Sequence, residues 1–113
     1  FGPEALAALR PGIVCVSINA YGHDGPWAGR RGWEQLAQAC TGVALEHCGL
    51  DVASEMRPAV IPAAPSDYCS GHLAALGAML ALLRQAEAGG SWEVRVSLAR
   101  TAQWIRGLGR VQD

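Results

Sequence analysis

The sequence contains no lysine, and its nine arginines are balanced by ten acidic residues, so that the net charge is −1. Such a balance gives no overall field that would draw the chain to nucleic acid or to an anionic membrane. Charged residues make up only 17% of the chain, whereas half of the residues are hydrophobic. Small domains normally expose much of their surface. We therefore expect a piece of a larger protein whose remaining chain covers apolar faces of this one.

The sequence also lacks any apolar run of the roughly 20 residues that a membrane span needs, and residues 73–83 predict a buried helix instead. It opens on Phe-Gly-Pro-Glu, without the basic region of a signal peptide, so we expect a cytoplasmic protein. No CxxC pair occurs, which favours free, buried thiols over disulfides and predicts no metal site. The cysteines are Cys15, Cys40, Cys48 and Cys69.

What is present is an alternation of helical and strand patterns. The expected helices are residues 3–9, 33–43, 66–88 and 98–108, and the expected strands are residues 13–18 and 93–97. A glycine-rich loop is expected between residues 19 and 32, and an extended segment between residues 57 and 64, where prolines exclude a long helix. Strands that alternate with helices predict an α/β fold with a mainly parallel sheet.

Three segments carry a more specific signal. Residues 17–26 (SINAYGHDGP) are similar to the pattern S-x-x-G-[FY]-G-x-x-G-P, with Ala20 in place of the usual glycine. Residues 32–42 (GWEQLAQACTG) contain [YH]-[DE]-x-x-x-Q-A-x-x-G, apart from its first position. Residues 66–71 (SDYCSG) precede an apolar helix and then residues 93–98 (EVRVSL). In this order and spacing they resemble the family III CoA-transferases, the CaiB/BaiF group that includes formyl-CoA transferases and α-methylacyl-CoA racemases.

The resemblance implies that residues 1–113 form part of a Rossmann-like large domain, without its N-terminal CoA-binding part and without the small domain. It implies coenzyme A as the acyl-CoA substrate, a carboxylic acid as acceptor, no metal, and an interlocked homodimer. The isolated chain would then be inactive, since CoA binding in this family draws on residues outside this stretch.

Two carboxylates are the implied catalytic residues. By resemblance, Asp67 attacks the thioester carbonyl of an acyl-CoA, in the manner of covalent catalysis. Glu34 corresponds to an acidic residue that helps to arrange the site. The residues alone leave a simpler interpretation open, because Asp and Ser are preferred helix N-caps and a first-turn Glu is favoured by the helix dipole.

The remaining candidates concern substrate binding. His23 and Gly22 of the glycine loop, and Arg30 and Arg31 after it, are candidate CoA contacts, although exposed loop residues of this kind often have no ligand. The other candidates are Trp33 and Tyr68, which we expect to line the acyl pocket, with a core position open for Trp33.

Two alternatives remain beside a transferase. In the racemase branch a histidine stands at the position of Trp33, and tryptophan has no usable base, which argues against a racemase or isomerase. A catalytically silent structural or dimerisation lobe is the other alternative, and the retention of Asp67 and Glu34 argues against it. Cys69 and His72 share a helix face but lack an orienting third group for a Cys–His nucleophile.

Overall fold

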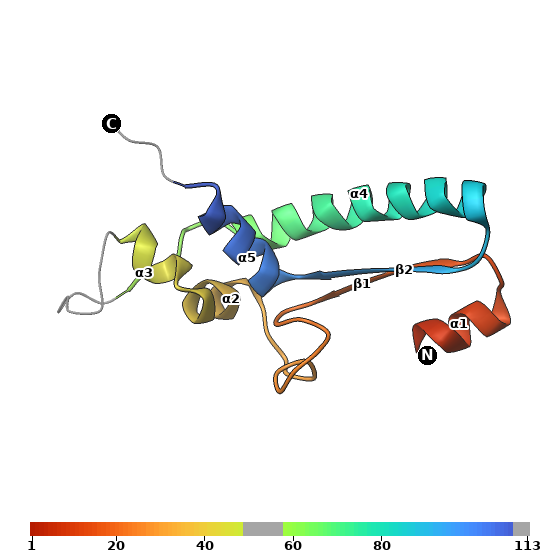
Figure 1. Cartoon of the computed structure of the whole chain (residues 1–113). Helices are drawn as coiled ribbons and strands as arrows, with labels where there is room; N and C mark the ends of the chain where they lie inside the picture. Colours follow the sequence, from red (N-terminus) through yellow and green to blue (C-terminus); the bar gives the residue numbers. More distant parts are fainter. Residues whose placement is uncertain (49–57, 110–113) are drawn as a thin grey trace.

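The computed structural model describes residues 1–48 and 58–109. These residues form five helices and two strands (Figure 1). The helices are α1 (Pro3–Leu9), α2 (Glu34–Thr41), α3 (Val43–His47), α4 (Pro65–Ala88) and α5 (Leu98–Gly107), and the strands are β1 (Val14–Asn19) and β2 (Trp92–Ser97). Among the described helices, none is long and apolar enough to cross a membrane.

The two strands pair in parallel, with Val14 opposite Trp92 and Asn19 opposite Ser97. A parallel pair needs a long crossover connection, and the 24-residue helix α4 supplies it. The predicted α/β fold with a parallel sheet is therefore confirmed. Helix α4 runs along one face of the sheet, and α1 lies on the other side (Figure 1).

The C-terminal ends of both strands lead to a cluster of helices α2, α3 and α5 (Figure 1). The start of α2 approaches the loop after β1 closely at Gly32, where an added Cβ would stand 2.5 Å from that of Ala20. Helix α2 ends at Gly42, whose φ of 84° lies in the left-handed region. The predicted helix 33–43 is therefore shorter than expected, and α3, which the sequence did not predict, follows it.

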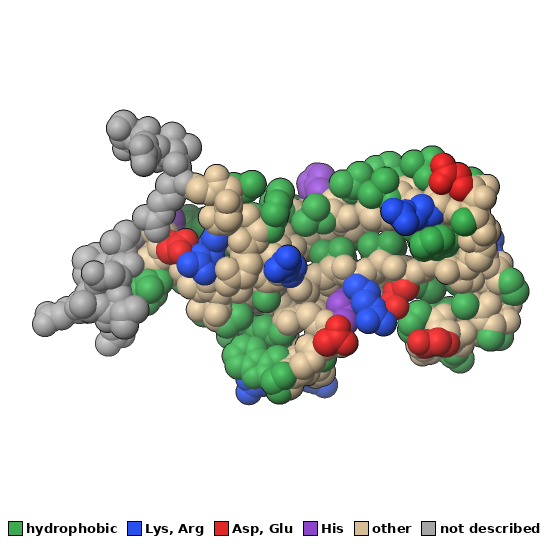
Figure 2. All heavy atoms as spheres, viewed as in Figure 1, with side chains coloured by type: hydrophobic (Ala, Val, Ile, Leu, Met, Phe, Trp, Pro, Cys, Tyr) green, Lys and Arg blue, Asp and Glu red, His purple; other side chains and the backbone are tan. Residues whose placement is uncertain are grey.

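Helix α4 is only partly buried within the described chain, whereas the sequence predicts a buried helix at residues 73–83. Only one side of it contacts the sheet, and an apolar stripe on its other side is exposed (Figure 2). The apolar stripe consists of Leu76, Met79, Leu80, Leu82 and Leu83. Periodicity identifies a helix that is hydrophobic all round, but it cannot say what covers each side.

The cysteine prediction is half right. All four thiols are free, but none is buried, and Cys40 is exposed. The extended segment is found in part: residues 58–64 form neither helix nor strand, and Arg57 lies outside the described residues. The second strand and the last helix agree with the prediction within one residue at each boundary.

The interior is small and unusually polar. Its apolar cluster holds Ala20, Ala37 and Leu98, with Tyr21 packed against it. The largest fully buried side chains are instead Gln38, Thr101, Ser66 and Ser70. Buried polar groups need partners, and most of these side chains find them around the first turns of α4, where both candidate catalytic carboxylates lie.

Candidate active site

The carboxylate of Glu34 lies against the N-terminus of α4. Its Oε2 accepts a hydrogen bond from the backbone N–H of Asp67 at 2.8 Å, and its Oε1 accepts one from the N–H of Ser66 at 3.3 Å. The side chain is only 2% exposed. The structure thus brings together the two predicted catalytic carboxylates, which are separated by 33 residues in the sequence.

The contacts of Glu34 correct the N-cap interpretation of Asp67. Helix α4 begins at Pro65 and its N-cap is Ala64, which places Ser66 and Asp67 inside the first turn. The N–H groups that an N-cap side chain would normally satisfy are instead bonded to Glu34. Among the described residues, the Asp67 carboxylate has no hydrogen-bond or ion-pair partner, and the residue is exposed. Local sequence could not reveal a cap supplied by another helix.

The charge state of Asp67 is set by its surroundings. Partial burial of the carboxyl and, second, the nearby Glu34 carboxylate raise the pKa of Asp67 above its ordinary value of 3.8. The positive end of the α4 dipole would favour the charged form. Glu34 already neutralises that end, so Asp67 gains little from the dipole. A carboxylate that is less stabilised by its surroundings is a better nucleophile toward a carbonyl carbon.

Gln38 is a functional candidate that the sequence analysis did not single out. Its Nε2 donates to Glu34 Oε1 at 2.8 Å and to the carbonyl of Ala63 at 3.2 Å, while its Oε1 accepts from the N–H of Ile61 at 2.8 Å. The side chain is fully buried. Gln38 belongs to the quoted helix pattern, and a glutamine at helical spacing from Glu34 was the available signal.

Two serines flank Asp67 on the buried side of α4. Ser70 Oγ donates to Thr101 Oγ1 of α5 at 2.7 Å, which ties the two helices together. Ser66 Oγ is buried and has no hydrogen-bond partner among the described residues. A buried hydroxyl without a partner is uncommon in folded proteins, and this one is adjacent in sequence to the candidate nucleophile.

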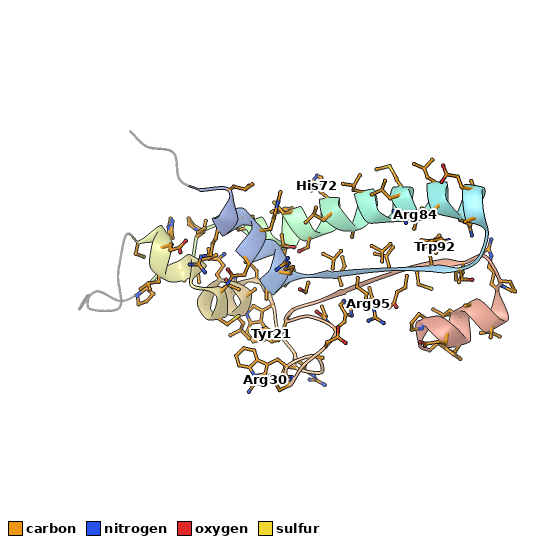
Figure 3. The ribbon with its side chains drawn as sticks, viewed as in Figure 1. Tyr21, Arg30, His72, Arg84, Trp92 and Arg95 are labelled. Atoms are coloured by element: carbon orange, nitrogen blue, oxygen red, sulfur yellow. The ribbon has the colours of Figure 1, made fainter. Side chains whose placement is uncertain are left out.

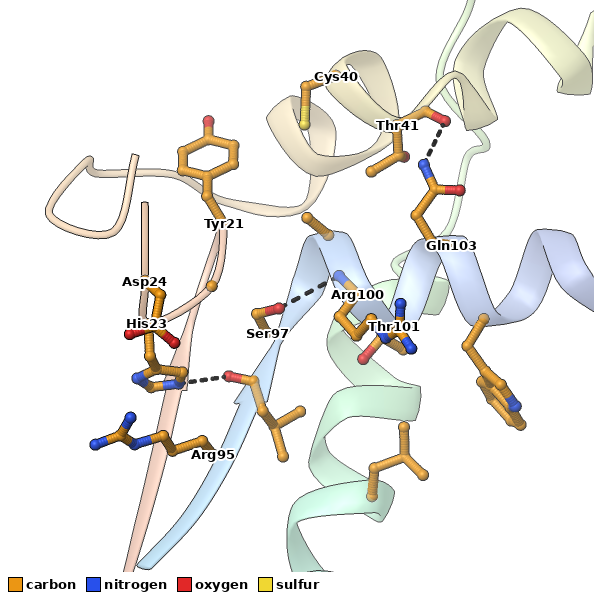
Figure 4. Close-up of a pocket in the computed structure, with 15 residues that line it drawn as sticks. Tyr21, His23, Asp24, Cys40, Thr41, Arg95, Ser97, Arg100, Thr101 and Gln103 are labelled. Atoms are coloured by element: carbon orange, nitrogen blue, oxygen red, sulfur yellow. Dashed lines mark hydrogen bonds between the residues drawn. The ribbon is translucent and has the colours of Figure 1, made fainter. Parts of the chain in front are cut away.

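A second feature is a hollow of about 820 Å³ beyond the ends of the strands (Figure 4). It is lined by residues that include Gly22, His23, Arg95, Ser97, Arg100 and Thr101. His23 Nε2 lies 3.2 Å from the carbonyl oxygen of Val96. Neither Asp67 nor Glu34 lines the hollow. The structure therefore gathers two of the predicted CoA contacts at a place that differs from the carboxylate pair.

The other predicted contacts do not line this hollow. The guanidinium of Arg30 stacks over the ring of Trp27 at 4.8 Å, and Trp27 meets Tyr21 edge to face at 5.2 Å (Figure 3). Arg31 is exposed in the same loop. Trp33 is 58% exposed and Tyr68 is 70% exposed. The core position left open for Trp33 is therefore wrong for the described chain.

Among the described residues, Cys69 and His72 are not joined by a hydrogen bond, and no metal-binding cluster is found. The described residues contain no group of three or more His, Cys, Asp or Glu side chains that would hold a metal ion. His72 Nδ1 lies 2.7 Å from the backbone carbonyl of Tyr68, one turn earlier in α4, and its side chain points away from the sheet (Figure 3).

Known proteins provide the context for this geometry. The model of CoA-transferase family III matches residues 1–108. An acetyl-coenzyme A transferase, nodX, of Hypoxylon pulicicidum is 39% identical over 104 residues, covering 90% of this chain and 17% of its relative. An acyl-CoA transferase of Gibberella moniliformis is 37% identical over 103 residues, covering 87% of this chain and 18% of that protein.

Solved structures of two further proteins share the fold of this chain. Rv3272 from Mycobacterium tuberculosis superimposes with a TM-score of 0.82 at 28% identity, covering 95% of this chain and 29% of that one. A CaiB/BaiF family protein from Brucella suis gives a TM-score of 0.78 at 25% identity, covering 93% and 27%. The chain thus spans less than a third of the length of each of these proteins.

Proposed function

This chain belongs to CoA-transferase family III, and we propose that the whole protein moves CoA from an acyl-CoA thioester to a carboxylic acid through a covalent intermediate on Asp67. The observation that carries the proposal is the contact between Glu34 and the N-terminus of α4. Because Glu34 occupies the backbone N–H groups, the Asp67 carboxylate stays exposed and is not used as a helix cap. An exposed carboxylate that has no hydrogen-bond or ion-pair partner among the described residues is available for chemistry.

In the proposed reaction, an oxygen of Asp67 attacks the carbonyl carbon of the thioester. The C–S bond breaks, CoA departs as the thiolate, and Asp67 becomes a mixed anhydride with the acyl group. The thiolate then attacks the Asp67 carbonyl, which releases the donor acid and leaves an aspartyl-CoA thioester. The acceptor carboxylate attacks the carbonyl of that thioester, the C–S bond breaks, and Asp67 forms a second mixed anhydride, now with the acceptor. The CoA thiolate then attacks the acceptor's acyl carbon, which gives the new acyl-CoA and frees the Asp67 carboxylate. Each step exchanges one acyl bond for another and needs no redox partner.

Glu34 has two roles in this proposal. It holds the backbone of Asp67 through the 2.8 Å hydrogen bond, which fixes where the nucleophile stands. Its negative charge also disfavours a second charge nearby and so contributes to the raised pKa of Asp67. The negative charge of Glu34 also repels the carboxylate of the acceptor acid, unless a positive group elsewhere in the whole protein offsets this repulsion.

The substrate contacts remain part of the proposal. We assign His23 and Gly22 at the hollow, together with Arg30 and Arg31, to CoA, and Trp33 and Tyr68, both exposed, to the acyl pocket. We further propose a cytoplasmic, interlocked homodimer whose other segments complete both sites. The relatives named as CoA-transferases support transfer, and a tryptophan at position 33 leaves a racemase without its histidine base.

The test is to trap the intermediate in the full-length protein. The protein is incubated with a panel of acyl-CoAs, treated with hydroxylamine and digested, and the peptide that contains Asp67 is examined by mass spectrometry for a hydroxamate. We expect a hydroxamate on Asp67 with at least one donor. Asp67→Asn should lose it and reduce turnover by roughly a thousandfold or more, the scale seen when a nucleophile is removed.

The matched control is Glu87→Gln, which removes an exposed carboxylate near the far end of α4 and should leave trapping unchanged. If CoA binds but Asp67 is never modified by any donor, the proposed transfer through this residue is wrong. In that case a silent lobe becomes the better interpretation.

A further inference from the structure

We infer that Gln38 is a positioning residue of the proposed site, because its buried amide holds both the Glu34 carboxylate and the backbone of residues 61–63, and through them the first turn of α4. The inference rests on the proposed function of Asp67. Gln38 does not touch Asp67 itself, so its effect on the chemistry would pass through Glu34 and through the segment that leads into α4.

The orientation of the Gln38 amide is determined by its partners. Its nitrogen has two acceptors, Glu34 Oε1 at 2.8 Å and the Ala63 carbonyl at 3.2 Å, and its oxygen has one donor, the Ile61 N–H at 2.8 Å. A glutamine amide offers two donors on nitrogen and an acceptor on oxygen. The reverse orientation would place oxygen against two acceptors. The side chain is 0% exposed, so water does not offer a substitute.

These contacts act on Asp67 from two directions. Glu34 Oε1 receives both the Gln38 amide and the Ser66 N–H, while Oε2 receives the Asp67 N–H. On the other side, residues 61–63 come immediately before the first residues of α4. A change at Gln38 would therefore move the carboxylate and the approach segment together. Displacements of about 1 Å can reduce an enzymatic rate by roughly a hundredfold.

The experiment uses the full-length protein with Gln38→Met, which keeps an unbranched chain of similar length and removes all three hydrogen bonds. The control is Gln35→Met, the same exchange at an exposed position of the same helix. We expect Gln38→Met to slow hydroxylamine-trapped acylation of Asp67 by roughly ten- to a hundredfold. The concentration of acyl-CoA at half-saturation should change by about twofold or less, since Gln38 does not line the hollow. Gln35→Met should match the native protein.

Hydrogen exchange separates this inference from the proposed function. In Gln38→Met the backbone N–H groups of Ile61, Ser66 and Asp67 should exchange faster than in the native protein, whether or not Asp67 reacts. Faster exchange without acylation of the native protein would support positioning and contradict the proposed function. Native exchange, or a native acylation rate, in folded Gln38→Met would overturn the inference.

If Gln38→Met does not fold, Gln38→Glu provides the test. It retains an acceptor for the Ile61 N–H but puts a second carboxyl beside Glu34. A proton shared between two neighbouring carboxyls would restore a donor. We therefore expect its acylation rate, relative to native, to rise as the pH falls, and a ratio that does not change with pH would overturn the inference.

Discussion

At the scale of single residues, Asp67 illustrates how a site can work against stability. Its raised pKa means that the folded protein holds the Asp67 proton more tightly than the unfolded chain does. The Asp67 carboxyl therefore makes its full contribution to the free energy of unfolding below the ordinary pKa of 3.8. That contribution is lost as the pH rises through the raised pKa of the folded protein. A functional carboxylate in such a position trades stability for reactivity.

The resulting prediction is that Asp67→Asn, which stays neutral, unfolds at a higher temperature than the native full-length protein near neutral pH. The difference should shrink toward zero as the pH falls below 3.8. Thermal unfolding followed by circular dichroism across this pH range measures it. Glu87→Gln removes an exposed carboxylate at the far end of α4 and should give no such pH-dependent gain. An unchanged or lower melting temperature for Asp67→Asn at neutral pH would contradict the argument.

Glu34 leads to a prediction of the opposite sign. Glu34→Ala would leave the N–H groups of Ser66 and Asp67 without their acceptor, and Gln38 Nε2 would keep only the carbonyl of Ala63. Losing a helix cap and leaving buried donors unpaired costs about 2 kcal/mol. We expect urea unfolding of the full-length protein to show a loss of this size. Gln35→Ala, one residue along the helix and exposed, should unfold almost as the native protein does.

At the scale of elements, the contact of α4 with β2 depends on a missing side chain. A Cβ added at Gly77 would lie 2.5 Å from Val94 Cγ1, whereas one added at Gly71 meets nothing within 4 Å among the described residues. Both glycines are inside the same helix, where replacement by alanine is normally favourable by about 1 kcal/mol. Replacing each glycine by alanine therefore distinguishes the effect of helix propensity, which both positions share, from the effect of packing, which only Gly77 has.

We expect Gly77→Ala to destabilise the full-length protein by about 1–3 kcal/mol, because overpacking outweighs the gain in helix propensity. Gly71→Ala should be neutral or stabilising. Adding Val94→Ala to Gly77→Ala should recover part of the loss, because it removes the methyl group that clashes with the added Cβ. Equal effects of the two glycine substitutions in unfolding experiments would show that the α4–β2 contact does not limit stability.

At the scale of the whole molecule, the described chain is long and thin, with extents of 55 × 32 × 21 Å. Its two-stranded sheet covers one side of α4 only, and the apolar stripe on the other side is exposed (Figures 1 and 2). A contiguous exposed apolar surface marks a place where another surface packs. The chain also spans less than a third of the length of its relatives. The exposed stripe and this short length together support the proposal that the remaining chain covers the stripe.

A charge placed in the apolar stripe tests this proposal. Leu80→Glu should destabilise the full-length protein by more than about 2 kcal/mol, because an unpaired carboxylate would be buried. In the isolated 113-residue chain the same change should instead reduce aggregation, as measured by light scattering. Ala86→Glu, at an exposed position near the end of α4, is the control. A harmless Leu80→Glu in the full-length protein would mean that the stripe faces solvent there.

The sequence by itself determined the order of the elements other than α3, because hydrophobic periodicity and the positions of glycine and proline are local properties. It also indicated the family, through the order and spacing of three motifs. It could not determine that Glu34 supplies the cap of α4, that Gln38 joins both to the segment before it, or that Asp67 is not an N-cap. Those facts depend on contacts between residues about 23 to 33 positions apart, and no local pattern encodes them. The exposed side of α4 is likewise decided by what packs against it, and this is a property of the tertiary structure.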